Sequence, residues 1–288
     1  MKPAPIVIFV YNRPDHLRRT LQSLSACDLA AESDLFVFSD GAKTEADEVK
    51  VNEVRYIIRT IEGFREVIIY NSYYNKGLAN SIIEGVSETL SVYEKVIVLE
   101  DDLIVSRNFL TYMNTCLDLF KHRTDIASIS GYTPPIVTHE DHSVYLSCRP
   151  GSWGWGTWRD RWDKIYWKDS REPNKKKFNR GGDDLTRMFK QQRAGKIDSW
   201  AVRWAHHNSR NSLYTVYPCV SKVLNIGTSE GTHFKSKEKR FDVVIDQNEF
   251  VLTNADIQPS DIMMERFRKF WKYTLWKRFK LFILDLIN

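Results

Sequence analysis

Long hydrophobic runs are absent from this sequence. None of its 288 residues lies in a stretch that approaches the ~20 consecutive apolar residues of a membrane-spanning helix. The first apolar run, in PIVIFVYN (5–12), is short and is followed at once by the charged residues Arg13 and Asp15. That pattern is unlike a secretory signal peptide. We therefore expect neither a membrane span nor a signal peptide.

Cysteine is scarce, and its spacing carries no motif. The four cysteines are far apart and form no CxxC pair: Cys27, Cys116, Cys148 and Cys219. This usage is typical of free thiols in a reducing compartment and excludes a disulfide framework. We therefore expect a cytoplasmic protein.

The common glycine-rich phosphate motifs and a strong excess of charge are missing too. There is no GxxxxGK[ST] and no GxGxxG after the first apolar run, which argues against a Walker-type site and a dinucleotide fingerprint. The net charge of +5 is too small to argue for nucleic acid as a partner. Aromatic residues, in contrast, are abundant at 13%, with nine Trp.

The first half of the chain alternates short apolar runs with amphipathic segments. The expected strands are 5–12, 34–41, 66–72 and 95–102, and the expected helices are 13–26, 44–62 and 77–93. Such alternation with short connections predicts an α/β fold with a mostly parallel sheet and right-handed crossovers. Ligands of such sheets bind outside the carboxyl ends of the strands.

Each expected strand ends in polar residues at that edge. They are Tyr11-Asn12-Arg13, Ser39-Asp40-Gly41, Asn71 with Asn75-Lys76-Gly77 just beyond, and Glu100-Asp101-Asp102. Taken singly, Asp40-Gly41 is an ordinary turn, Asn12 a helix cap, Arg13 a solvated charge and the acidic triplet a polar strand end. Four such endings at one edge of one sheet favour a binding site instead.

The acidic triplet needs a neutralising partner because adjacent carboxylates repel one another. Hard oxygen ligands suit Mg²⁺ or Mn²⁺, and such an ion is commonly shared with substrate phosphates. Without a Walker motif or a dinucleotide fingerprint, the residues indicate a metal-bridged diphosphate of another kind.

These motifs resemble a known family. Four segments, in this order along the chain, are similar to glycosyltransferases of the GT-A fold: VYNRPDHLRRTLQSL, FSDGAK, NKGLANSIIEGV and VIVLEDDLIVSRNFLTYMN. The likeness covers about residues 5–235. These segments resemble the family 2 type used in bacterial polysaccharide synthesis. They also resemble the N-acetylglucosaminyltransferase I group, which has an acidic triplet of this form. The resemblance implies a Rossmann-like nucleotide-diphospho-sugar transferase fold.

The resemblance also implies roles for the strand-end residues. Asp40 matches an aspartate that contacts the base or ribose, and Arg13, with Asn12 beside it, matches a group that contacts the nucleotide. Asp102 matches the metal ligand, while Asp101 and Glu100 match residues that touch ribose and sugar. The loop expected to close over the donor consists of Asn75, Lys76, Gly77 and Leu78.

The second half is expected to supply the acceptor site. In SWGWG, three nearby glycines argue against a regular element, and Trp153 and Trp155 suit stacking on sugar rings. Trp158 and Trp162, spaced i and i+4, are expected in the core instead. The resemblance likewise implies that a Trp-Gly-Trp loop lines the active site, and a core cluster is the alternative.

Asp198, Trp200 and His233 complete the expected site. From the residues alone Asp198 is a helix N-cap; the resemblance implies a catalytic base that takes the proton of the acceptor hydroxyl, with Trp200 beside it. His233 ends a glycine-containing segment and matches a second metal ligand, with a structural histidine as the alternative. Ser229 and Glu230 depart from the usual pattern of that segment.

The last residues, 261–288, differ in composition from the rest. Aromatic and aliphatic residues recur there at helical spacing among many Lys and Arg, typical of a helix that lies on a membrane surface. A helix packed on the domain, or an oligomer contact, is the alternative. We expect a transferase domain over 1–260, with a nucleotide-sugar half (1–132) and an acceptor half (133–260), followed by this helix.

These features together predict an inverting, metal-dependent glycosyltransferase. The expected donor is a UDP-sugar, and the expected acceptor is a lipid-linked saccharide at the inner face of a bacterial membrane. Two alternatives stay open. A nucleotidyltransferase on a similar sheet would normally have a glycine-rich, basic signature after the first strand, which YNRPDHL lacks. A non-catalytic carbohydrate-binding protein is the other.

Overall fold

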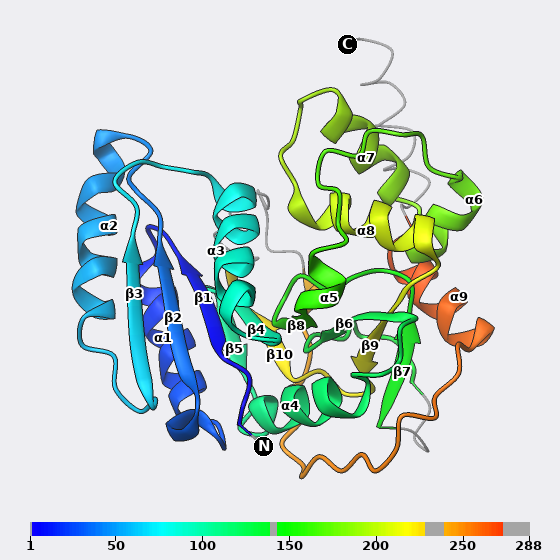
Figure 1. Ribbon diagram of the computed structural model, residues 1–288, viewed down its shortest axis with the longest axis horizontal. Coiled ribbons are helices and arrows are strands. Elements are labelled where there is room, and N and C mark those ends of the chain that lie inside the picture. The colour runs from blue at the N-terminus through cyan, green and yellow to red at the C-terminus, as the bar shows by residue number, and fades with distance from the viewer. Residues whose placement is uncertain (1, 139–142, 228–238, 273–288) are drawn as a thin grey trace.

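The computed structural model describes residues 2–138, 143–227 and 239–272. It contains an eight-stranded sheet in the order β3-β2-β1-β4-β8-β6-β9-β7 and a two-stranded sheet, β10-β5 (Figure 1). The strands are β1 Ile6–Val10, β2 Asp34–Ser39, β3 Glu66–Asn71, β4 Lys95–Glu100, β5 Leu103–Val105, β6 Ile126–Ser130, β7 Val144–Ser147, β8 Trp155–Trp158, β9 Tyr214–Pro218 and β10 Val223–Asn225. The α-helices are α1 Pro14–Ser25, α2 Glu45–Ile58, α3 Leu78–Val92, α4 Phe109–Leu119, α5 Arg159–Trp162, α6 Lys175–Phe178, α7 Leu185–Arg193, α8 Trp200–Asn211 and α9 Asp261–Phe270.

Strands β1 to β4 form the expected parallel unit. β1 pairs in parallel with β2 and β4, and β2 with β3. All five residues of β1 are buried, because α1 and α2 pack on one face of the sheet and α3 on the other. The expected α/β class, with a large sheet flanked by helices, is confirmed.

Local sequence explains where the helices of this half begin. Pro14 opens α1, where its missing N–H is not needed. Thr44 and Asp47 form a reciprocal capping box at the start of α2. Gly77 precedes α3 with a φ of 76°, a conformation that favours glycine. The three turns therefore bring the helix N-termini to the edge where the strands end.

The second half makes the sheet mixed. β8 lies antiparallel between β4 and β6, β6 and β9 are parallel, and β7 is antiparallel to β9. The expectation that the glycines of SWGWG prevent a regular element was wrong for residues 155–158. The strand has room only for glycine at position 156, because a Cβ there would clash with the Val96 carbonyl oxygen and with Met113 Cε, each 2.9 Å away. Trp158 and Trp162 are buried, as expected.

Helix α9 packs on the domain. Its apolar residues Met263, Met264 and Phe267 are buried, and Phe267 contacts Tyr145 and Tyr217 beside the edge strand β7. For this stretch the structure corrects the expected membrane-surface stripe in favour of a packed helix. The rest of the tail, 273–288, lies outside the described residues. Among the helices that are described, none is long and apolar enough to cross a membrane.

Candidate functional site

The ends of β1 to β4 open into one cleft that encloses about 2120 Å³ of empty space, part of it open to solvent. The second half of the chain closes its far side. The predicted residues that line it are Asn12, Arg13, Asp40, Asn75, Gly77, Leu78, Glu100, Asp101, Asp102, Trp153 and Asp198. Residues from four strand ends and from the start of α8 thus face a common space.

The acidic triplet is the electrostatic centre of this cleft. Asp101 and Asp102 are buried, and Glu100 is partly buried. Burial, and then repulsion from Asp102, raise the pKa of Asp101 to about 7. Burial and the two neighbouring carboxylates raise the pKa of Glu100 well above its ordinary value. Full ionisation of the triplet would therefore place more negative charge here than its surroundings neutralise.

Each carboxylate has a different environment. Asp101 Oδ2 accepts a hydrogen bond from the Tyr11 backbone N–H at 3.1 Å, and Thr20 Oγ1 donates to the Asp101 carbonyl at 2.8 Å. Arg13 Nη1 donates to Asp102 Oδ2 at 2.9 Å. Burial raises the pKa of Asp102, although Arg13 opposes the shift. Asp102 Oδ1 is buried and has no hydrogen-bond partner among the described residues.

This donor set fits a hard divalent cation. The Asp102 oxygen without a partner is an available hard ligand, and a cation would relieve the repulsion within the triplet. The described residues contain no group of three or more His, Cys, Asp and Glu that could hold a metal ion by itself. Further ligands would therefore have to come from water, from substrate phosphates or from outside the described residues. The predicted ligand His233 lies outside them.

Asp40 holds the loop after β3 through its carboxylate. Its Oδ1 accepts from the backbone N–H of Gly41 (2.9 Å) and Lys76 (2.8 Å), and its Oδ2 accepts from that of Gly77 (3.0 Å). Asn75 Nδ2 donates to the Gly41 carbonyl at 2.8 Å. Asp40 therefore joins the end of β2 to the start of α3, whatever else it contacts.

Two predicted donor residues have other partners. The Lys76 side chain pairs with Glu84 at 2.7 Å, and Lys76 is not among the residues that line the cleft; its backbone N–H donates to Asp40. Asn12 Nδ2 donates to Asp47 Oδ1 at 2.7 Å, which links the end of β1 to the capping box of α2. Asn12 is thus no cap of α1, although it does line the cleft.

Asp198 lies at the start of α8 but does not cap it. The N-cap is Ser199, whose hydroxyl accepts from the Val202 N–H. The Asp198 side chain is 58% exposed and pairs with Arg203 at 2.7 Å. The interpretation of Asp198 as an N-cap was therefore wrong, and its carboxylate is accessible from the cleft.

The three predicted acceptor tryptophans separate into two groups. Trp153 lines the cleft and contacts Tyr132 and Phe241 edge to face. Trp155 and Trp200 are buried in a cluster with each other and with Trp204. The expectation that Trp155 and Trp200 contact sugar was therefore wrong, because core side chains cover their rings.

Sequence reasoning did not find several residues of the cleft. They are His16, Lys43, Lys50, Ser81, Asn225 and Gly227. Gly227 is the most constrained, because a Cβ there would lie 2.0 Å from Asp102 Oδ2. The available signal was a glycine two residues after a short strand, in VLNIG (223–227).

Comparisons with known proteins give distant likenesses. No protein-family model matches the chain. An alpha-1,3-mannosyl-glycoprotein 2-beta-N-acetylglucosaminyltransferase of Arabidopsis thaliana is 23% identical over 190 residues, which cover 59% of this chain. The chain spans only 42% of the length of that relative. By its name the relative belongs to the group that the sequence motifs resemble.

Two solved structures illustrate the structural likenesses. A mannosyltransferase from Pyrobaculum calidifontis, in complex with GDP-Man and Mn²⁺, has a TM-score of 0.40 and 14% identity, covering 56% of this chain and 46% of that one. A UDP-glucose pyrophosphorylase complexed with UDP-glucose has a TM-score of 0.39 and 12% identity, covering 75% of this chain and 90% of that one. Likenesses of this size do not decide between sugar transfer and nucleotide transfer.

Proposed function

We propose that this chain is an inverting, divalent-cation-dependent glycosyltransferase that uses a nucleoside diphosphate sugar. The observation that carries the proposal is the carboxylate Asp102: buried beside two further carboxylates, it has one oxygen paired with Arg13 and one with no partner among the described residues. The motif resemblance and the Arabidopsis relative support the same class.

In the proposed reaction an acceptor hydroxyl oxygen attacks the anomeric carbon of the donor. The bond between that carbon and the diphosphate oxygen breaks, and the nucleoside diphosphate leaves. Asp198 takes the hydroxyl proton, for which its exposed carboxylate is suited. A cation bound at Asp102 would stabilise the charge of the leaving diphosphate. Arg13 and two residues in the first turn of α3, Leu78 and Ser81, line the same cleft, and a guanidinium and a helix N-terminus are suited to bind anionic donor groups.

We propose Mn²⁺ or Mg²⁺ as the cation, a UDP-linked hexose or N-acetylhexosamine as the donor, and a saccharide acceptor. Trp153 is the aromatic face available to that acceptor in the cleft. For the cellular role, we propose bacterial surface polysaccharide synthesis with a lipid-linked acceptor. The protein would meet this acceptor at the cytoplasmic face of the membrane. The basic residues in 273–288 support such a membrane contact.

A panel of sugar nucleotides tests the class. Each is incubated with the protein and Mn²⁺, and the phosphate products are identified. Cation-dependent release of a nucleoside diphosphate supports a glycosyltransferase. Release of pyrophosphate from a nucleoside triphosphate and a sugar 1-phosphate would mean a nucleotidyltransferase. Tight binding of a saccharide with no release from any donor would mean a carbohydrate-binding protein.

A further inference from the structure

Lys222 is a buried cation directly before β10. Its side chain is 2% exposed, and its ammonium pairs with the carboxylate of Asp246. The ammonium also lies over the rings of Phe250 (5.2 Å from the centroid) and Tyr112 (5.9 Å). Nothing in the proposed reaction uses this pair, because neither residue lines the cleft.

The backbone of Lys222 begins a run that ends at the acidic triplet. Lys222 N–H donates to the Gly131 carbonyl at 2.8 Å, and its carbonyl accepts from Ser106 N–H at 2.8 Å. β10 then pairs with β5, the strand that begins directly after Asp102, with Val223 opposite Val105 and Asn225 opposite Leu103.

At its far end this run contacts Asp102 in two ways. The Ile226 N–H donates to the Asp102 carbonyl at 2.9 Å. Gly227 packs against the Asp102 carboxylate so closely that a Cβ would reach Oδ2 at 2.0 Å. Asn225 Oδ1 accepts from the Gly227 N–H at 2.8 Å and fixes the turn. The position of residues 222–227 thus limits the space around the Asp102 carboxylate.

Asp246 holds the other side of the pair. Its N–H donates to the Ser221 carbonyl at 2.8 Å, and its carboxylate accepts from the Asn248 N–H at 2.9 Å. Asn108 Nδ2 donates in turn to the Asn248 carbonyl. The ion pair therefore joins a distant segment of the chain to the start of the run that reaches Asp102.

Stability alone is a weak reason for such a pair. Removing two charges from water is costly, and replacing a buried ion pair by apolar residues of similar volume is often neutral or stabilising. We propose that Lys222 is a positioning residue: its pair with Asp246 fixes residues 222–227 so that Ile226 and Gly227 hold the Asp102 carboxylate in the geometry that binds a divalent cation. The inference rests on the proposed function only for the identity of the ligand.

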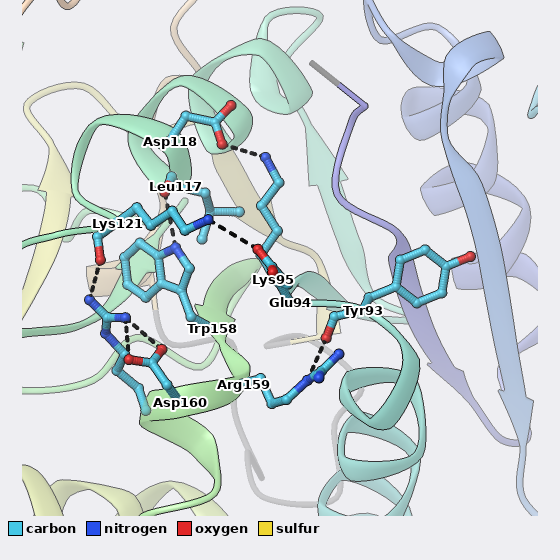
Figure 2. A network of polar contacts seen from close by, with 10 residues as sticks. Tyr93, Glu94, Lys95, Leu117, Asp118, Lys121, Trp158, Arg159 and Asp160 are labelled. Atoms are coloured by element: carbon cyan, nitrogen blue, oxygen red, sulfur yellow. Dashed lines mark hydrogen bonds and ion pairs between the residues drawn. The ribbon is translucent and has the colours of Figure 1, made fainter.

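A pair of double variants separates positioning from simple packing. K222M/D246L replaces the pair by apolar side chains of similar size. K95M/D118L is the matched control, because Lys95 and Asp118 are 2.5 Å apart and partly buried (Figure 2). Lys95 also begins the same strand, β4, that ends at Glu100. In Figure 2 this pair lies in a polar network around Trp158, whose residues do not line the cleft.

Two quantities are measured in each variant: the affinity for Mn²⁺ alone, by electron paramagnetic resonance, and the amide hydrogen exchange of Ile226 without any ligand. We expect K222M/D246L to melt no lower than wild type, to bind Mn²⁺ about tenfold to hundredfold more weakly, and to exchange the Ile226 amide at least about tenfold faster. The control is expected to change neither quantity.

The outcomes are distinguishable. Wild-type values of both quantities in a folded K222M/D246L protein would overturn the positioning role. A wild-type protein that binds no Mn²⁺, either alone or together with UDP, would contradict the proposed function, while the exchange of Ile226 still judges the positioning. If K222M/D246L does not fold, the measurement uses Asp246→Glu instead, because this variant keeps the charge but displaces the carboxylate. An unchanged Ile226 exchange rate in Asp246→Glu would also overturn the inference.

Discussion

Arg13 Nη1 donates to Oδ2 of Asp102 at 2.9 Å, while Oδ1 of the same carboxylate has no hydrogen-bond partner among residues 2–138, 143–227 and 239–272. The guanidinium thus neutralises one oxygen and leaves the other available. A divalent cation at Asp102 would either bind this carboxylate alongside Arg13 or displace Arg13 from it. Arg13 by itself does not satisfy the carboxylate, and this incompleteness distinguishes Asp102 from an ordinary buried ion pair.

Asp102→Asn removes the charge at this point but keeps its shape. We expect kcat to fall by about 10²-fold or more, because the leaving diphosphate loses its electrostatic stabilisation. Excess EDTA should have a similar effect on the wild-type protein. The matched control is Asp15→Asn, a carboxylate at the cleft that is 92% exposed, and it should leave kcat nearly unchanged. Full activity of the wild-type protein in EDTA would exclude the cation-dependent mechanism.

The raised pKa of Asp101 predicts how stability depends on pH. Burial and the charge of Asp102 raise this pKa from 3.8 to about 7, so between these values the folded protein holds a proton that the unfolded chain releases. The free energy of unfolding therefore falls as pH rises through this window, and the fall levels off once pH has passed the folded-state pKa. The protonated carboxyl carries no such penalty at low pH, whereas the buried, ionised carboxylate lowers stability at high pH.

The comparison with Asp101→Asn isolates this effect. The variant has no proton to lose, and its amide oxygen can still accept from the Tyr11 N–H. Thermal unfolding from pH 4 to pH 8 in EDTA should show the wild-type protein losing stability relative to the variant as pH rises. Parallel curves for the two proteins would show that Asp101 titrates at its ordinary pKa. Added Mn²⁺ should stabilise the wild-type protein more at pH 8 than at pH 5.

Asp198→Asn tests the proposed base. We expect kcat to fall by about 10²–10⁴-fold with nucleotide affinity nearly intact, because only proton transfer is lost. Stability should hardly change, since this side chain is exposed and does not cap α8. Ser199→Ala is the control: it should cost about 1 kcal/mol of stability by removing the cap while turnover survives. Normal turnover by Asp198→Asn would mean that another group accepts the proton.

Much of the first half was predictable because its signals are local. Apolar runs, Pro14 and Gly77 set strands and helices in a strict alternation, and the parallel sheet then brings all four strand ends to one edge. The cleft and most of its residues follow from that topology. The burial of Asp102 could be inferred from its place after β4, but its pairing with Arg13, 89 residues away, could not.

Several of the errors share a cause, because the partner of a side chain is not visible in a local sequence pattern. Trp155 and Trp200 lie in sequence contexts much like that of Trp153, yet α8 and β8 bury them against each other. Lys76 was expected to contact the donor, but its side chain reaches Glu84 across one face of α3. The close contact of Gly227 with Asp102 depends on the pairing of β10 with β5, strands of only three residues each.

The C-terminal tail gives the last prediction, which uses two truncations. Deleting 273–288 leaves α9 in place with its buried side chains. Deleting 261–288 also removes Met263, Met264 and Phe267 from the core, where truncating even one such side chain typically costs about 2–5 kcal/mol. The shorter deletion should therefore melt close to the full-length protein, and the longer one should melt far lower or be insoluble.

The same truncations locate membrane contact. Residues 273–288 include Lys277, Arg278 and Lys280 among several aromatic residues, and each basic residue near anionic lipid contributes about 1 kcal/mol to binding. We expect the full-length protein to float with anionic vesicles, less so at high salt, and the protein lacking 273–288 to remain unbound while still hydrolysing the donor. If the full-length protein ignores such vesicles, the membrane proposal fails. If binding survives the shorter deletion, the contact lies in the folded domain, where α9 exposes basic residues such as Lys269 beside its buried face.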